Sequence, residues 1–163
     1  MRHDSLIVFC LCVCSLFANA QSESLEKNSH HCFFHPNSLV GGLGATYSGE
    51  FQTVGFNSRV YYNITEQLCL GSEFSFLKSG KEELKEVNFV AHYIFETRFI
   101  GIYPLAGVNF SHEKKAETDS DWGFKGGVGV HRNVKKFNIY AEFSITESDL
   151  RDRFVTLGFL YMF

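Results

Sequence analysis

The chain has 163 residues, enough for one domain, and a formal net charge of −3. Its charged residues form no block of like sign, so the composition gives no indication of a nucleic-acid partner. With 18 Phe, 7 Tyr and only 2 Pro the composition favours strands, and no apolar run reaches the ~18 residues that a membrane-spanning helix needs.

Residues 1–20 have the three parts of a secretory signal peptide. Arg2 supplies the positive start, residues 6–17 form a short apolar core, and Ala18 and Ala20 frame a small-x-small cleavage site. We therefore predict that this segment is removed on export. An uncleaved helical anchor is the alternative, although the apolar core is short for one.

Residues 21–37 are polar and irregular, and we interpret them as a periplasmic N-terminal arm. The arm contains four side chains that can ligate soft metals, namely His30, His31, Cys32 and His35. Their spacing matches no zinc module, so we predict neither a metal site nor a cofactor site.

Alternation of apolar and polar residues begins at Leu39 and continues to the C-terminus. Because strand side chains alternate between two faces, each alternating segment predicts a strand with one apolar face and one mixed face. The segment with Pro104 is the least regular, since proline cannot donate to a ladder and often marks a bulge, and its facing stays open. The predicted strands are residues 39–48, 54–64, 68–77, 87–96, 99–112, 122–131, 137–146 and 153–163.

The links between these segments differ in length. Those after the second, fourth and sixth strands are tight, and the others are longer and charged (residues 78–86 and 112–121) or intermediate (residues 49–53 and 147–152). Short turns on one side and longer loops on the other are typical of outer-membrane barrels, and an even number of strands places both termini on the short-turn, periplasmic side. We therefore predict an all-β fold, an eight-stranded antiparallel up-and-down transmembrane β-barrel over residues 38–163.

The direction of the apolar face separates two kinds of barrel. The mixed face carries many glycines, which suit a crowded lumen but would weaken strands on an exposed surface. The apolar face holds about twenty large side chains, more than an eight-stranded lumen can contain. We therefore predict that this face contacts lipid. The alternative is a soluble, secreted, lipocalin-like barrel that binds a hydrophobic ligand inside.

Charged residues on the mixed face would lie inside the barrel, where charges must be paired. A symmetric turn around Thr65 places Arg59 opposite Glu73, and we expect Lys125 one diagonal step from Glu142. We interpret this lumen as a polar plug that fixes the register of the strands. The alternative is a narrow, porin-like channel for small solutes.

Export would remove three of the five cysteines and leave Cys32 and Cys69 in an oxidising compartment. Cys69 is expected to face inward one residue beyond a periplasmic turn, and Cys32 lies on the arm. A disulfide between the two, which would pin the arm to the lower rim of the barrel, is a hypothesis.

The last strand carries a family signal. Its apolar face ends in a terminal aromatic residue and consists of Val155, Leu157, Phe159, Tyr161 and Phe163. Together with residues 62–76 (YNITEQLCLGSEFSF) and 122–130 (WGFKGGVGV), this strand resembles the small bacterial outer-membrane β-barrels of the OmpA/OmpX-like, porin-like group. The resemblance implies a location in outer-membrane lipid and assembly by the barrel insertion machinery through the C-terminal strand. It implies no single activity, since members include adhesion proteins, membrane anchors and a few enzymes.

No enzyme is predicted. A lipid deacylase would need a Ser–His pair oriented by an acid, and the candidates Ser111 and His112 are adjacent on a strand, so they point to opposite faces. We therefore expect a structural or surface-interaction role, with the outer loops as the surface that meets an extracellular partner.

Overall fold

A computed structural model describes residues 34–97, 100–114, 118–134, 137–148 and 151–163. The predicted signal peptide, Cys32 and most of the N-terminal arm lie outside these residues, and their assignments stay predictions. Within the described ranges, no helix is long and apolar enough to cross a membrane.

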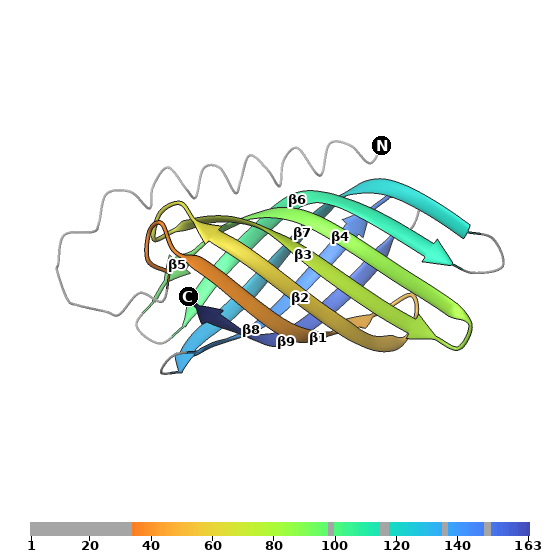
Figure 1. Ribbon diagram of the computed structural model, residues 1–163, viewed down its shortest axis with the longest axis horizontal. Coiled ribbons are helices and arrows are strands. Elements are labelled where there is room, and N and C mark those ends of the chain that lie inside the picture. Colours follow the sequence, from red (N-terminus) through yellow and green to blue (C-terminus); the bar gives the residue numbers. More distant parts are fainter. Residues whose placement is uncertain (1–33, 98–99, 115–117, 135–136, 149–150) are drawn as a thin grey trace, which may run out of the picture. The chain divides into compact units, whose positions relative to one another are not determined.

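The described chain forms one antiparallel sheet that closes on itself (Figure 1). The sheet order is β4-β3-β2-β1-β9-β8-β7-β6-β5, and pairing of β4 with β6 completes the barrel. This arrangement confirms the predicted fold class. The strands are β1 (Leu39–Ser48), β2 (Thr53–Asn63), β3 (Leu68–Ser79), β4 (Glu82–Tyr93), β5 (Phe95–Glu96), β6 (Gly101–Lys114), β7 (Thr118–Val134), β8 (Phe137–Glu147) and β9 (Asp152–Met162).

β4 and β5 together form one strand of the barrel, which makes eight strands in all. Both pair with β6 in the same register, with His92 opposite Leu105 and Phe95 opposite Ile102. The ladder is interrupted between these pairs, beside Pro104, because proline has no N–H to donate. Neither β4–β5 nor β6 contains an inserted residue at this point. Pro104 therefore marks a gap in the ladder, and the anticipated bulge is absent there.

The two longer charged loops predicted from the sequence are replaced by extended strands. β3 continues to Ser79 and β4 starts at Glu82, while β6 continues to Lys114 and β7 starts at Thr118. The reason is that alternation persists through the charged residues: Leu77 and Leu84 point inward and are buried, whereas Lys78 and Lys85 point outward and are exposed. Charge on the outward face is compatible with a strand that extends beyond an apolar belt.

The prediction that the apolar face points away from the lumen is confirmed, since large apolar side chains cover the outside of the barrel and polar ones fill the inside. Trp122 and Phe124 on β7 are 65% and 72% exposed, whereas inward residues such as Asn57 and Asn88 are fully buried. The facing of β6, which the sequence left open, is also settled: Tyr103 and Leu105 point inward, and Ile102 and Val108 point outward. A lipocalin-like interior for a hydrophobic ligand is therefore wrong for this chain.

Candidate functional site: a filled polar lumen

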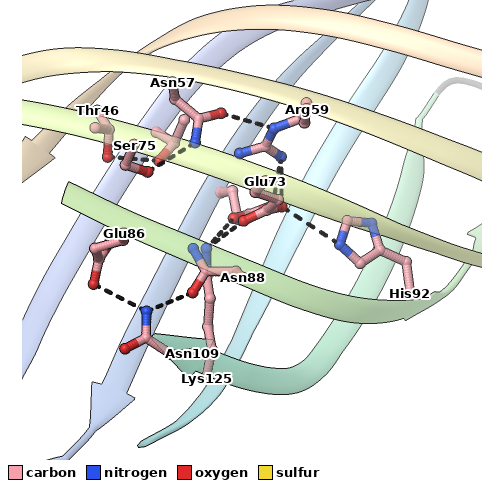
Figure 2. A network of polar contacts seen from close by, with 12 residues as sticks. Thr46, Asn57, Arg59, Glu73, Ser75, Glu86, Asn88, His92, Asn109 and Lys125 are labelled. Carbon is pink, nitrogen blue, oxygen red and sulfur yellow. Dashed lines mark hydrogen bonds and ion pairs between the residues drawn. The ribbon is translucent and has the colours of Figure 1, made fainter. Parts of the chain in front are cut away.

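Four charged side chains meet in the middle of the barrel. Arg59 Nη1 lies 2.9 Å from Glu142 Oε2 and 3.4 Å from Glu73 Oε1. Lys125 Nζ donates to Glu73 Oε2 and lies 3.8 Å from Glu142 Oε1. Each side chain is buried, and Figure 2 shows Arg59 and Lys125 approaching Glu73 from two sides. Two cations and two carboxylates balance one another, which is the condition for burying charge.

The strands place these residues in different ways. Arg59 on β2 stands directly opposite Glu73 on β3, at inward positions of one hairpin. Lys125 on β7 stands opposite Thr146, whereas Glu142 on β8 stands opposite Gly129. The expected single diagonal step between Lys125 and Glu142 is therefore wrong as a register. Their contact arises because the long lysine side chain runs through the lumen.

Polar and aromatic groups surround the four charges. The Tyr61 hydroxyl donates a hydrogen bond to Glu73, and the Tyr103 hydroxyl donates one to Glu142 Oε2 at 3.2 Å. Arg59 Nε donates to Asn57 Oδ1 at 2.9 Å. The Arg59 guanidinium also lies over the Tyr140 ring, 4.2 Å from its centroid. These contacts orient Arg59, Glu73 and Glu142 within the buried network, while Arg59 Nη2 and Glu142 Oε1 make no hydrogen bond to the described residues.

Inward glycines make room for these rings. A Cβ at Gly129 would lie 2.2 Å from the Tyr103 ring, and a Cβ at Gly158 would lie 2.5 Å from the Tyr140 hydroxyl oxygen. Neither separation is possible for real atoms. At Gly129 and Gly158, the glycine that the sequence places on the mixed face therefore leaves the space that a tyrosine ring occupies.

Toward the end opposite the C-terminus, a network of side-chain hydrogen bonds fills the lumen. Asn109 Nδ2 donates to Asn88 Oδ1 at 2.6 Å, and Ser111 Oγ donates to Glu86 Oε1 at 3.2 Å (Figure 2). On the opposite wall, the hydroxyls of Thr46 and Thr156 share a hydrogen bond of 2.9 Å. Side chains in mutual contact therefore fill the lumen both in the middle of the barrel and at this end.

The end that holds the C-terminus is closed by Phe34, although the polar composition of residues 21–37 predicts an arm outside the barrel. Its ring is 4% exposed and meets the His131 ring edge-on, with centroids 5.1 Å apart. The chain turns back at Asn37, whose φ is 60° and whose amide donates to Asn63 O at 2.8 Å. The cavity left beside Phe34 measures about 10 Å³, room for about one water molecule. An apolar pair, Phe33-Phe34, in an otherwise polar segment is the signal that would have revealed this role.

Glu73, His92 and Glu142 offer ligand atoms within 4.8 Å of one another, a spacing that suits a metal ion. Both carboxylates, however, already contact the cations Arg59 and Lys125. Adding a divalent cation would introduce unbalanced positive charge at a buried position. We therefore assign the three residues to the ion-pair network.

The remaining predicted site residues lie apart from this network. Cys69 is buried on the inner face, as expected, but Cys32 lies outside the described residues, so their disulfide stays a prediction. Ser111 points inward to Glu86, whereas His112 points outward and its Nδ1 lies 2.7 Å from Ser120 Oγ. The five residues proposed as an assembly signal all point outward and are exposed: Val155, Leu157, Phe159, Tyr161 and Phe163.

Comparison with solved structures identifies the class of fold. The N-terminal β-barrel domain of Pseudomonas aeruginosa OprF superposes with a TM-score of 0.66 at 14% identity, covering 78% of this chain and 98% of that one. Ail of Yersinia pestis gives 0.57 at 19% identity, covering 77% and 97%. The P. aeruginosa outer membrane protein OprG gives 0.58 at 11% identity, covering 80% and 98%. No family model and no curated protein matches the chain.

The chain therefore has the fold of the small outer-membrane β-barrels, the OmpA/OmpX-like architecture. The structures that share it include membrane-embedded barrels, which supports an outer-membrane location. At these levels of identity the likeness concerns the fold, and the role of the chain has to be argued from its own residues.

Proposed function

We propose that this chain is an integral outer-membrane β-barrel protein with a closed lumen and a structural or surface-interaction role. The observation that carries the proposal is the contrast between its two faces. A belt of exposed apolar side chains surrounds the barrel, while balanced ion pairs occupy its centre. A closed barrel satisfies its backbone hydrogen bonds internally, which is what lipid demands of a spanning structure.

The topology supports one orientation of the barrel in the membrane. β1 begins beside the end of β9, with Val40 opposite Met162, so both lie at the end of the short turns. That end faces the periplasm in outer-membrane barrels. The β3–β4 and β6–β7 hairpins then project from the outer surface and form the surface offered to an extracellular partner.

The C-terminal strand fits the role of assembly signal that the resemblance implies. β9 closes the barrel by pairing with both β8 and β1. The outward apolar side chains of β9 and of the adjoining Phe163 stay accessible until lipid covers them. We infer that the barrel insertion machinery recognises this strand. Changing Phe163 to Ala should lower the amount of barrel inserted, whereas Phe137→Ala, an outward aromatic on the neighbouring strand, should not.

Heat-modifiability tests the location. A folded barrel in an outer-membrane fraction should migrate differently on electrophoresis before and after boiling. Recovery of the protein as a soluble periplasmic species would overturn the proposal.

Conductance tests the closed lumen. Purified barrel in a planar bilayer should show no unitary current, because the central ion pairs and Phe34 fill the lumen in the part of the chain that the structure describes. Regular single-channel steps from protein with intact heat-modifiability would favour the narrow channel instead.

A further inference from the structure

An outward-facing cluster of basic side chains lies where β3, β4 and β6 run side by side. Lys78 stands opposite Glu83, which in turn stands opposite Lys114 on the next strand. One step along β4, Lys85 stands opposite His112. The basic cluster, as we name Lys78, Lys85 and Lys114, thus belongs to three adjacent strands.

The basic cluster carries more positive charge than the described outward side chains beside it balance. Lys78 Nζ lies 3.2 Å from Glu83 Oε1. This hydrogen bond, together with the charges of Lys78, Lys114 and Lys85, lowers the pKa of Glu83, so its carboxylate is ionised at neutral pH. Among the described outward side chains of these three strands, this one carboxylate offsets one of three ammonium groups. Like charges held this close favour binding of a further anion.

The cluster lies just beyond the apolar belt. Phe76 precedes Lys78 by one outward position on β3, and Phe110 precedes His112 by one outward position on β6. Phe110 packs against Trp122 with ring centroids 5.0 Å apart. Aromatic side chains gather at the boundary between hydrocarbon and headgroups, so the basic cluster is at the level of the headgroups.

An open apolar groove of about 570 Å³ leads along the outer surface to this cluster. Ala45 is its floor, because it stands between two large outward residues, Phe56 on β2 and Leu157 on β9. Phe76 and Lys78 line the end of the groove that meets the basic cluster. The groove is therefore apolar along its length and has an ammonium group at one end.

We propose that this groove and the basic cluster form a binding site for a phosphorylated glycolipid of the outer leaflet, with the chemistry of lipid A. An acyl chain would lie over Ala45, and a phosphate would contact Lys78, Lys85 and Lys114. The proposal rests on the membrane location proposed above. Lipid A suits the site because it is the phosphorylated lipid of the leaflet that the β3–β4 hairpin faces, and because an exposed cationic cluster at headgroup level attracts such anions.

Native mass spectrometry of the purified, folded barrel in zwitterionic detergent tests the site. The probes are diphosphoryl lipid A, the same lipid after enzymatic dephosphorylation, and phosphatidylglycerol. We expect diphosphoryl lipid A to be retained at least tenfold more than the dephosphorylated form, and the triple variant Lys78→Gln, Lys85→Gln, Lys114→Gln to lose this preference. Lys81→Gln, in the turn of the same hairpin, is the matched control and should retain it. Ala45→Phe, which fills the groove, should weaken retention of both forms of lipid A.

Equal retention of the phosphorylated and dephosphorylated lipids, or a triple variant that binds like the parent, would overturn the site. Equal retention of phosphatidylglycerol and lipid A would overturn the assignment to lipid A. Every variant is first checked for heat-modifiable mobility in the membrane fraction. If the unmodified barrel passes this check and shows no phosphate preference, only this inference is contradicted. If the unmodified chain is absent from the membrane, the proposed location is contradicted.

Discussion

Arg59 on β2 and Glu142 on β8 form an ion pair of 2.9 Å across the lumen, although two other strands, β1 and β9, lie between them in the sheet. No hairpin brings these residues together. The contact exists only because the sheet is closed, and it joins opposite walls of the barrel. We therefore expect the packed polar centre of the lumen to depend on the ion pair between Arg59 and Glu142.

Replacing Arg59 with Ala should destabilise the barrel by about 3–5 kcal/mol, since it leaves a buried carboxylate without its main partner. Urea unfolding in lipid vesicles, followed by the fluorescence of Trp122, the single tryptophan, measures the change. Arg153→Ala, at an exposed outward position, is the control and should stay within about 0.5 kcal/mol of the parent. Equal effects of the two substitutions would contradict the role given to Arg59.

Gly129→Ala should destabilise the barrel by about 1–3 kcal/mol through overpacking. The added Cβ would collide with the ring of Tyr103, whose hydroxyl donates a hydrogen bond to Glu142. Gly126 on the same strand is the matched control, since a Cβ there meets nothing within 4 Å. The stability of each variant is measured as the temperature at which the electrophoretic band of the folded barrel disappears. A Gly126→Ala variant as unstable as Gly129→Ala would show that backbone freedom, rather than space, is what these glycines supply.

Phe34→Ala should open the periplasmic mouth, because it removes the ring that packs on His131 and lies in the same buried cluster as Cys69. Loss of a buried phenyl ring costs about 3–5 kcal/mol. In a Cys32→Ser background, Cys69 in the folded barrel should react with a small thiol reagent faster after this change. Phe137→Ala, an outward aromatic at the same end, should leave the rate unchanged. An identical rate in the two variants would show that Phe34 does not close the lumen.

Leu157→Arg should destabilise the barrel in lipid by about 2–4 kcal/mol, the cost of a charge near the middle of the bilayer. Val134→Arg, outward on β7 at the periplasmic end, should cost about 0–1 kcal/mol. Both positions are exposed, so a barrel surrounded by water would tolerate the two changes alike. Equilibrium unfolding in vesicles compares them, and similar values would contradict a lipid-facing belt.

The alternation of side chains made most of the architecture predictable. Val155, Leu157 and Phe159 share one face in any extended chain, and the large volume of that face requires it to point away from a narrow lumen. The position of Arg59 opposite Glu73 is similarly local, because one short turn around Thr65 determines the register of its hairpin. In the outer hairpins, the charged residues predict loops, although Lys78 and Lys85 occupy outward positions of continuing strands.

Three features required the closed barrel. Lys125 reaches Glu73, and Arg59 reaches Glu142, because closure brings strands that are not neighbours in the sheet to opposite sides of one narrow space. Phe34 enters the lumen because the mouth that receives it is formed by several strands together. Alternation depends only on the two directions in which a strand can point its side chains, so the sequence alone reveals it. Contacts across the lumen depend on the combined register and tilt of all eight strands, which no single segment specifies.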